Sequence, residues 1–393
     1  MFKITKRALL STIALSAMLG TGAFAADPVR IGFIESMTGP FSVNGNGTAF
    51  AVQAEVDAIN AKGGLLGRKV EIVLRDSASD PSKALAMTNS LLFNDNIDVL
   101  IGPGSSGEAF PMMDLVAGAK KLFVTPTQAD PLIDPVKRPL TFRAMPTVGA
   151  VAQRTVQFTN ETLKKKKIVI FADSTGYGAN VADLLKAEYA KTGVTPLAVT
   201  LINVNQADVT PEMSKARDAG ADLIEFWSSA NGLLARLINA RGELGWNVPV
   251  AGHTNMLAKD IAGLVEKPEY FNDVYAITYS NSVYDDAGKL PPKSQEFVDL
   301  TAKELGKGAA AAPLFTLMMG AGLVETYAEG VKRANSFDPE KIKAALESGG
   351  PFDTAFGTFN YSPTDHTGFA LASMEFVKVG SDYAYGNKRL KLQ

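Results

Sequence analysis

Two short apolar stretches near the start of the chain decide the fold, VRIGFI at 29–34 and KVEIVL at 69–74. Both are rich in β-branched residues and therefore predict strands. The segment between them has apolar residues at helical spacing (Ala49, Val52, Val56 and Ile59) and stops at two glycines, 63–64. A strand, a helix and a second strand of these lengths predict a unit with parallel strands.

The same alternation continues along the chain. Further strands are predicted at 98–101, 122–125, 168–172, 194–202, 221–226 and 248–251. Helices are predicted at 81–94, 107–120 and 147–163, and again from 178. The pattern restarts near residue 146, which predicts a second sheet. We therefore expect an α/β protein with two Rossmann-like lobes and parallel-rich sheets.

The first 25 residues have the composition of a signal peptide. Lys3, Lys6 and Arg7 precede an apolar run, and Ala23-Phe24-Ala25 is an A-x-A cleavage site. We expect cleavage near Ala25/Ala26 and export of a mature chain of 368 residues, a length that suits two domains. No later run reaches 18 apolar residues.

Composition narrows the class of protein further. The 393 residues include no cysteine, so disulfides and the lipid-bearing cysteine of a lipoprotein are both excluded. Removal of the leader changes the net charge from −2 to −5, which disfavours nucleic acid and anionic membranes as partners. We predict an exported protein that diffuses freely, without a lipid tether.

In doubly wound sheets, ligands bind beyond the carboxyl ends of the strands. Five predicted loops lie there, at 35–48, 102–107, 125–131, 173–178 and 227–231. The second reads GPGSSG, which permits three interpretations. It matches a dinucleotide fingerprint, as in an exported NAD(P)-dependent oxidoreductase, although it follows the third strand. It could hold a small anion. Alternatively, Ser105 and Glu108 form a capping box without a ligand.

Other candidate residues follow the second set of strands. Tyr177 stands between two glycines, Trp227 belongs either to the core or to a cleft wall, and His253 follows a strand. His366 lies in a turn and is expected to face solvent. The chain has only two histidines, no H-E-x-x-H and no G-x-S-x-G. An enzyme is disfavoured, and we predict no metal and no cofactor.

Several motifs of the chain match those of a known protein family. They are Met37-Thr38-Gly39-Pro40, Ile59-Asn60-Ala61-Lys62-Gly63-Gly64, Asp76 with Asp80-Pro81, Ile101-Gly102-Pro103, Ser106, Thr125-Pro126, Tyr177-Gly178, and Gly357 with Phe359. The chain resembles the branched-chain amino acid (Leu/Ile/Val) binding proteins, type I periplasmic binding proteins of ABC importers. The resemblance implies two lobes joined by a three-crossover hinge, with the ligand between them. It places residues 26–145 plus 279–355 in the N-terminal lobe and 146–278 plus 356–393 in the C-terminal lobe.

The resemblance also suggests ligand-binding positions. Ser106, beside Ser105, matches the serine that binds the ligand carboxylate, and Thr127 matches the carbonyl that accepts from the ligand ammonium. The other matching positions are Asn44, Ala129, Tyr177, Ala230 and Thr254, with His253 and Trp227 nearby. Ala129 lacks the family hydroxyl and Thr254 lacks its acid, which leaves an ammonium without a carboxylate partner. Glu225, Asp173 or Asp130 could replace that charge.

We therefore predict a monomeric solute-binding protein that delivers a small carboxylate, an aromatic or aliphatic acid without an α-amine, to an ABC permease. A true branched-chain amino acid-binding protein remains an alternative. A periplasmic sensor subunit is a further one, since it would share this fold.

Overall fold

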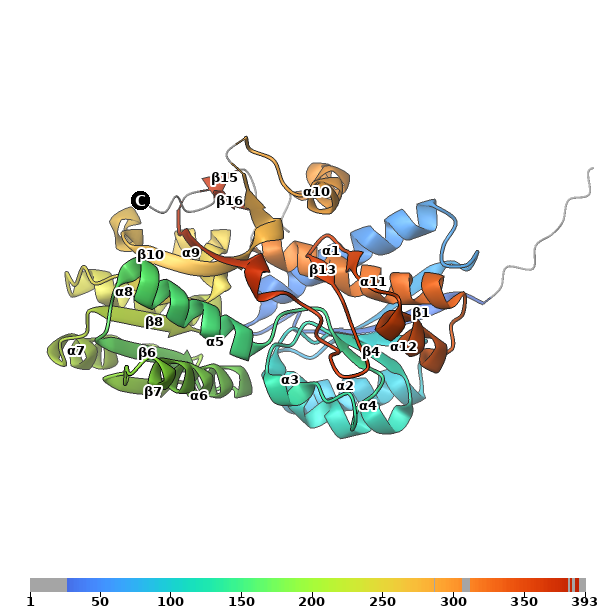
Figure 1. Cartoon of the computed structure of the whole chain (residues 1–393), viewed down its shortest axis with the longest axis horizontal. Helices are drawn as coiled ribbons and strands as arrows, with labels where there is room; N and C mark the ends of the chain where they lie inside the picture. Colours follow the sequence, from blue (N-terminus) through green and yellow to red (C-terminus); the bar gives the residue numbers. More distant parts are fainter. Residues whose placement is uncertain (1–26, 286, 306–311, 381, 384–385, 389–393) are drawn as a thin grey trace, which may run out of the picture.

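The computed structural model describes residues 27–285, 287–305, 312–380, 382–383 and 386–388. The predicted leader and its cleavage site lie outside these residues. The predicted α/β class is confirmed, because the chain forms two large, mainly parallel sheets with helices against them (Figure 1). None of the described helices is long and apolar enough to cross a membrane.

The first sheet is entirely parallel, in the order β2-β1-β3-β4-β5. Its strands are β1 (Val29–Glu35), β2 (Val70–Asp76), β3 (Val99–Ile101), β4 (Leu122–Thr125) and β5 (Thr141–Arg143). β1 lies between two neighbours and is buried along nearly all its length, whereas β2, at the edge, is half-exposed. The predicted strands 29–34 and 69–74 are thus confirmed.

The second sheet repeats this order and adds one strand. β7-β6-β8-β9-β10 follows the same pattern as β2-β1-β3-β4-β5, and β14 pairs antiparallel with β10 at the edge. The strands are β6 (Ile168–Asp173), β7 (Ala198–Ile202), β8 (Leu223–Trp227), β9 (Val250–Gly252), β10 (Val274–Tyr279) and β14 (Met374–Lys378). Two sheets with one order confirm the predicted restart.

Helices cover both sheets. They are α1 (Ser42–Ala61), α2 (Pro81–Phe93), α3 (Ser106–Ala109), α4 (Met113–Ala119), α5 (Val148–Gln157), α6 (Gly176–Lys191), α7 (Thr210–Asp218), α8 (Asn231–Glu243), α9 (Lys259–Leu264), α10 (Pro292–Leu305), α11 (Leu314–Ala334) and α12 (Pro339–Ser348). The predicted helix 107–120 is divided by a 3₁₀ turn, Phe110–Met112, that contains Pro111. The predicted helix 147–163 ends in a π-helical turn, Phe158–Leu163.

The remaining elements are short. β11 (Val283–Tyr284), β15 (Asp382–Tyr383) and β16 (Gly386–Lys388) form a small sheet, and β12 (Phe352–Asp353) pairs with β13 (Thr358–Phe359). Further 3₁₀ turns lie at Asp130–Leu132, Thr254–Leu257, Pro268–Phe271, Ser280–Ser282 and Leu371–Ser373.

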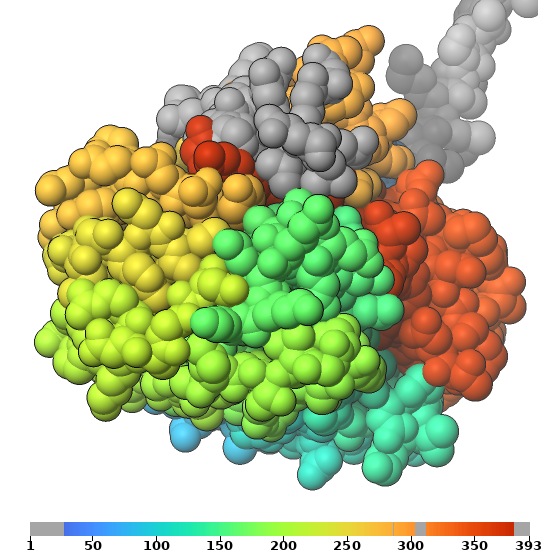
Figure 2. Space-filling model, turned by 60° about the vertical axis from the view of Figure 1, so that its left-hand side comes forward, coloured from blue at the N-terminus to red at the C-terminus, as the bar shows by residue number. Residues whose placement is uncertain are grey.

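Late segments of the chain return to the first sheet. α11 packs along α1, and Gly320 permits the close approach, because a Cβ there would lie 2.8 Å from the Thr48 carbonyl oxygen (Figure 1). β14 then returns to the second sheet. In Figure 2 the green-to-yellow segments around the second sheet lie against cyan segments around the first sheet and against orange-red segments from the last part of the chain. The exact lobe borders stay predictions.

The prediction that His366 faces solvent is wrong. The side chain is 1% exposed and stacks on Phe142, with ring centroids 4.1 Å apart. Nδ1 lies 3.0 Å from the Thr141 carbonyl oxygen and Nε2 lies 2.9 Å from Glu347 Oε1. The turn that carries His366 folds back onto β5, a contact that no local sequence pattern encodes.

Candidate functional site

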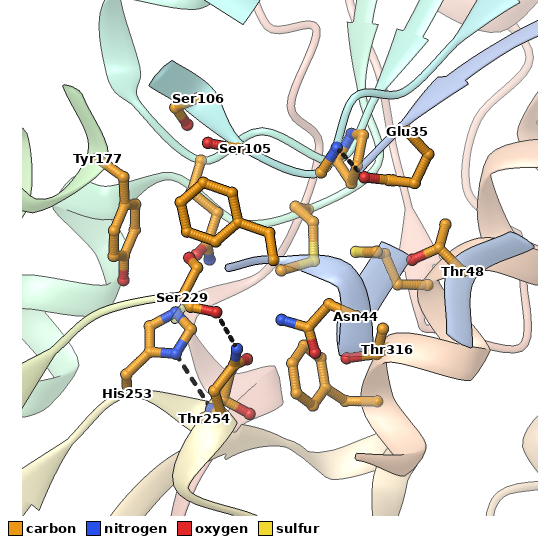
Figure 3. Close-up of a pocket in the computed structure, with 18 residues that line it drawn as sticks. Glu35, Asn44, Thr48, Ser105, Ser106, Tyr177, Ser229, His253, Thr254 and Thr316 are labelled. Carbon is orange, nitrogen blue, oxygen red and sulfur yellow. Dashed lines mark hydrogen bonds between the residues drawn. The ribbon is translucent and has the colours of Figure 1, made fainter. Parts of the chain in front are cut away.

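A cavity of about 60 Å³ lies between the two sheets, beyond the carboxyl ends of their strands (Figure 3). The first-sheet side supplies Glu35 at the end of β1, Asn44 and Thr48 on α1, and the loop 104–106 after β3. Each of the five predicted strand-end loops contributes at least one wall residue. A cavity on this scale suits a small molecule.

The loop after β3 presents two serine hydroxyls. Ser106 Oγ accepts a hydrogen bond from the Ala129 amide at 3.2 Å, so its own proton remains available to a ligand. Ser105 occupies the N-cap position of α3 but makes no side-chain cap hydrogen bond. Glu108 instead accepts from Ser36 Oγ at 2.7 Å. The capping-box interpretation of this loop is therefore wrong, because Ser105 makes no cap hydrogen bond and Glu108 turns toward Ser36 at the end of β1.

The second-sheet side supplies Tyr177, Ser229 and the turn 253–255. His253 Nδ1 accepts from the Asn255 amide at 3.1 Å, which leaves the proton on Nε2. Burial lowers the pKa of His253 to about 3, so the ring is neutral at physiological pH. The Tyr177 ring meets the His253 ring edge-on, 5.3 Å between centroids. Burial also raises the pKa of Tyr177 above its usual value, so its hydroxyl keeps its proton.

Aromatic and thioether side chains form much of the remaining wall. Phe41 precedes α1, Met145 follows β5, and Phe315 and Met319 come from α11. These groups offer apolar surface to the body of a ligand. The cavity therefore combines polar groups with an apolar lining, as small-molecule sites do.

Buried polar atoms without a partner concentrate in this cavity. They are Glu35 Oε2, Asn44 Oδ1, Tyr177 OH, Thr254 Oγ1, Asn255 Oδ1 and Thr316 Oγ1. Each such atom costs about 1–3 kcal/mol when it stays unpaired. Six of them around one space, contributed by both sheets and α11, indicate a site that is completed by a polar ligand.

Sequence analysis missed Glu35, the acid that lines this cavity. It is 2% exposed, and burial raises the pKa of its carboxyl to about 7, assisted by the nearby Glu108. An acidic residue that ends an otherwise apolar, buried strand is the signal that could have identified it. Glu225, Asp173 and Asp130, which we had considered as replacement acids, do not line the cavity.

Two expected contacts, Thr127 and Ala129, lie behind the wall. The buried guanidinium of Arg143 donates from Nε to the Thr127 carbonyl at 2.8 Å and from Nη2 to the Ala129 carbonyl at 2.7 Å. Arg143 thus takes the Thr127 carbonyl that was expected to face a ligand ammonium. Pro126 and Gln128, from the same loop, line the cavity instead.

Trp227 and Ala230 also lie outside the cavity wall. Trp227 is fully buried, and its Nε1 donates to Glu225 Oε2 at 3.2 Å, so it belongs to the core of the second sheet. Ala230 is the N-cap residue of α8 and donates its amide to Ser228 Oγ at 3.0 Å. Of the predicted positions, the structure brings together Asn44, Ser105, Ser106, Tyr177, His253 and Thr254.

Two glycines of the 102–107 loop pack against β1. A Cβ on Gly102 would lie 2.0 Å from the Ile34 carbonyl oxygen, and one on Gly104 would lie 3.1 Å from Glu35 Oε1. This packing accounts for these two glycines without a dinucleotide, whereas a Cβ on Gly107 would lie 3.6 Å from the Cβ of Thr175. Within the described part of the chain, no group of three or more His, Asp or Glu side chains is placed to hold a metal ion.

Comparisons with known proteins agree with this architecture. A Leu/Ile/Val-binding protein, BraC3 of Rhizobium johnstonii, is 30% identical over 384 residues, which span 94% of this chain and 97% of the relative. A type 1 periplasmic binding protein of Bordetella pertussis superposes with a TM-score of 0.83 at 24% identity, covering 93% of this chain and all of that one. A solute-binding protein of an ABC transporter from R. palustris, solved in complex with 4-hydroxybenzoate, superposes with a TM-score of 0.77 at 18% identity. The match covers 93% of this chain and 96% of that one. Residues 28–384 match the periplasmic binding protein family, and the chain belongs to that family.

Proposed function

We propose that the protein captures a small carboxylate solute in the cavity between its two sheets and delivers it to an ABC importer. The observation that carries this proposal is the Ser106 hydroxyl, whose oxygen is occupied by the Ala129 amide and whose proton is therefore free for an acceptor. Ser105 Oγ stands beside it without a capping role. Two neighbouring hydroxyl donors suit a carboxylate oxygen.

Donors on the opposite wall support a polar, anionic ligand head. His253 is neutral with its proton on Nε2, and Tyr177 keeps its hydroxyl proton. No lysine or arginine belongs to the described cavity wall. The carboxylate would therefore be held by neutral donors, with the aromatic residues Phe41 and Phe315 against the ligand body.

Two classes of ligand are candidates, and they differ in whether the acid carries an α-amine. Thr254 in the cavity, at the position of the family acid, favours an aromatic or aliphatic acid without an α-amine. The name of the Rhizobium relative favours leucine, isoleucine or valine. A carboxylate is common to both candidates.

The leader at residues 1–25 and the absence of cysteine support a mature protein that starts near Ala26 and diffuses through the periplasm without a lipid anchor. Its partner would be the permease of an importer in the inner membrane. We propose a monomer, because one chain supplies both sides of the cavity. The role is binding, not catalysis.

Calorimetry with Ser106→Ala tests this proposal. Removing one charge-assisted hydrogen bond should weaken carboxylate binding by about 1.5–3 kcal/mol. The control is Ser82→Ala, at an exposed position on α2, which should bind as the wild type does. Equal affinities for wild type and Ser106→Ala would contradict the proposed carboxylate contact.

A further inference from the structure

Only one of the two carboxyl oxygens of Glu35 has a structural role. Its Oε1 accepts from the Ser36 amide at 2.9 Å and from the Gly104 amide at 3.1 Å, which fastens the loop after β3 to the end of β1. One carboxylate oxygen completes this task. The other, Oε2, is buried without a hydrogen-bond partner, and Glu35 is one of the residues that line the cavity.

The position of the carboxyl group relative to the serines follows from Gly104. A Cβ built on Gly104 would lie 3.1 Å from Glu35 Oε1 and 3.2 Å from Oε2. Both oxygens therefore flank the backbone that continues directly into Ser105 and Ser106. Figure 3 shows Glu35 on the same side of the cavity as this loop. A carboxylate bound at the serines would lie close to a second carboxyl group.

Two neighbouring carboxylates repel each other unless a proton donor lies between them. The described cavity wall contains no lysine or arginine that could lie between them. Glu108 adds to the negative potential at Glu35. If Glu35 is ionised, the ligand itself must therefore supply the donor. A protonated Glu35 would donate to the ligand carboxylate and would not discriminate among acids, an outcome that the ligand series below detects.

We propose, on the basis of the proposed function, that Glu35 is a ligand-binding residue that selects acids carrying a hydrogen-bond donor next to their carboxylate. The donor is an ammonium or a hydroxyl group on the 2-carbon, and it pairs with Glu35 Oε2. This chemistry admits 2-amino and 2-hydroxy acids. It rejects 2-oxo acids, which present an acceptor there, and unsubstituted acids, which leave Oε2 unpaired.

Two matched series of ligands test this selection. The first has the leucine skeleton: leucine, 2-hydroxy-4-methylpentanoate, 4-methyl-2-oxopentanoate and 4-methylpentanoate. The second has a phenyl group: phenylglycine, mandelate, phenylglyoxylate and phenylacetate. In calorimetry with the full-length mature protein, the donor-bearing members of at least one series should bind at least tenfold more tightly than the 2-oxo and unsubstituted members. The tighter of the amino and hydroxy compounds identifies the donor.

Glu35→Gln is the informative variant. The amide oxygen can keep the two backbone hydrogen bonds, while an NH₂ group replaces Oε2 and can only donate. The tenfold preference should therefore disappear, and the 2-oxo acid should gain affinity. Glu225→Gln is the matched control: Glu225 is also buried with a pKa raised to about 7, but it contacts Tyr189 and Trp227 away from the cavity. The Glu225→Gln variant should keep the ligand preference of the wild type.

The outcomes separate this inference from the proposed function. If Ser106→Ala weakens every acid but Glu35→Gln leaves the ratios unchanged, the carboxylate site stands and the role of Glu35 is overturned. Equal wild-type affinities for donor-bearing and donor-free acids would also overturn it. No binding by any of the eight compounds would contradict the proposed function and this inference together.

Discussion

Phe110 and Gly176 meet across the border between the two sheets. A Cβ built on Gly176 would lie 2.7 Å from Phe110 Cε2 and 3.7 Å from the Gly107 Cα. Gly176 begins α6, behind β6, whereas Phe110 follows α3, beside the serine loop. The Asp130 amide also donates to Asn180 Oδ1 at 3.3 Å. These contacts join the two rims of the cavity.

Gly176→Val should weaken ligand binding without unfolding the protein. The added side chain clashes with Phe110 only when the rims touch, at a cost of about 1–3 kcal/mol, which corresponds to roughly 5- to 150-fold in affinity. Calorimetry measures the affinity and the melting temperature without ligand serves as the folding check. The double variant Gly176→Val/Phe110→Ala should regain most of the affinity. Unchanged affinity in the single variant would show that closure does not require this contact.

Ligand should compact the protein. The rims meet through non-covalent contacts such as Phe110 with Gly176, so the free protein should populate an open form that ligand converts to a closed one. Small-angle scattering should show a smaller radius of gyration at saturating ligand than without ligand. An identical radius in both conditions would contradict a closing motion.

Ser105→Ala should leave stability nearly unchanged. Because Ser105 makes no cap hydrogen bond, the free energy of unfolding should change by less than about 0.5 kcal/mol. Thr147→Ala is the comparison, since Thr147 caps α5 by accepting from the Ala150 amide at 3.0 Å and its loss should cost about 1 kcal/mol. Urea unfolding measures both. A loss of 1 kcal/mol or more in Ser105→Ala would restore the capping interpretation.

His253 should make the protein less stable in acid. Burial lowers its folded-state pKa from 6.5 to about 3, so the unfolded chain binds a proton more readily than the folded one. The contribution of the neutral His253 ring to the free energy of unfolding is complete above pH 6.5. It is lost as the pH falls from 6.5 toward 3, by up to about 1.4 kcal/mol per pH unit. Urea unfolding at pH 6.5, 5.5 and 4.5 should show a steeper loss in wild type than in His253→Asn. Parallel curves would contradict a buried, neutral ring.

Trp227→Phe should destabilise the protein and leave ligand affinity unchanged. The substitution removes the donor to Glu225 Oε2, and an unpaired buried carboxyl oxygen costs about 1–3 kcal/mol. Trp246→Phe, at the half-buried second tryptophan, should cost less. Thermal unfolding and calorimetry measure the two effects. A tenfold loss of affinity in Trp227→Phe would place Trp227 in the ligand site after all.

Local patterns predicted most elements, because strand and helix signals depend on neighbouring residues. The predicted end of the strand at Ile101 and the predicted start of the helix at Pro81 agree with β3 and α2. The strand-end loops therefore indicated where the cavity would be. Errors arose where contacts were distant: His366 is buried because it reaches Thr141 and Glu347, far away in sequence.

The sequence by itself determined the α/β alternation, the doubled sheet and the strand-end position of the site, because periodicity and the direction of parallel strands suffice for these features. Only the tertiary structure decided which side chains line the cavity. Arg143 draws the carbonyls of Thr127 and Ala129 away from the cavity, and the packing of the 104–106 loop on β1 brings Glu35 into its wall. Such choices depend on which buried polar groups find partners across the fold, and no local pattern records them.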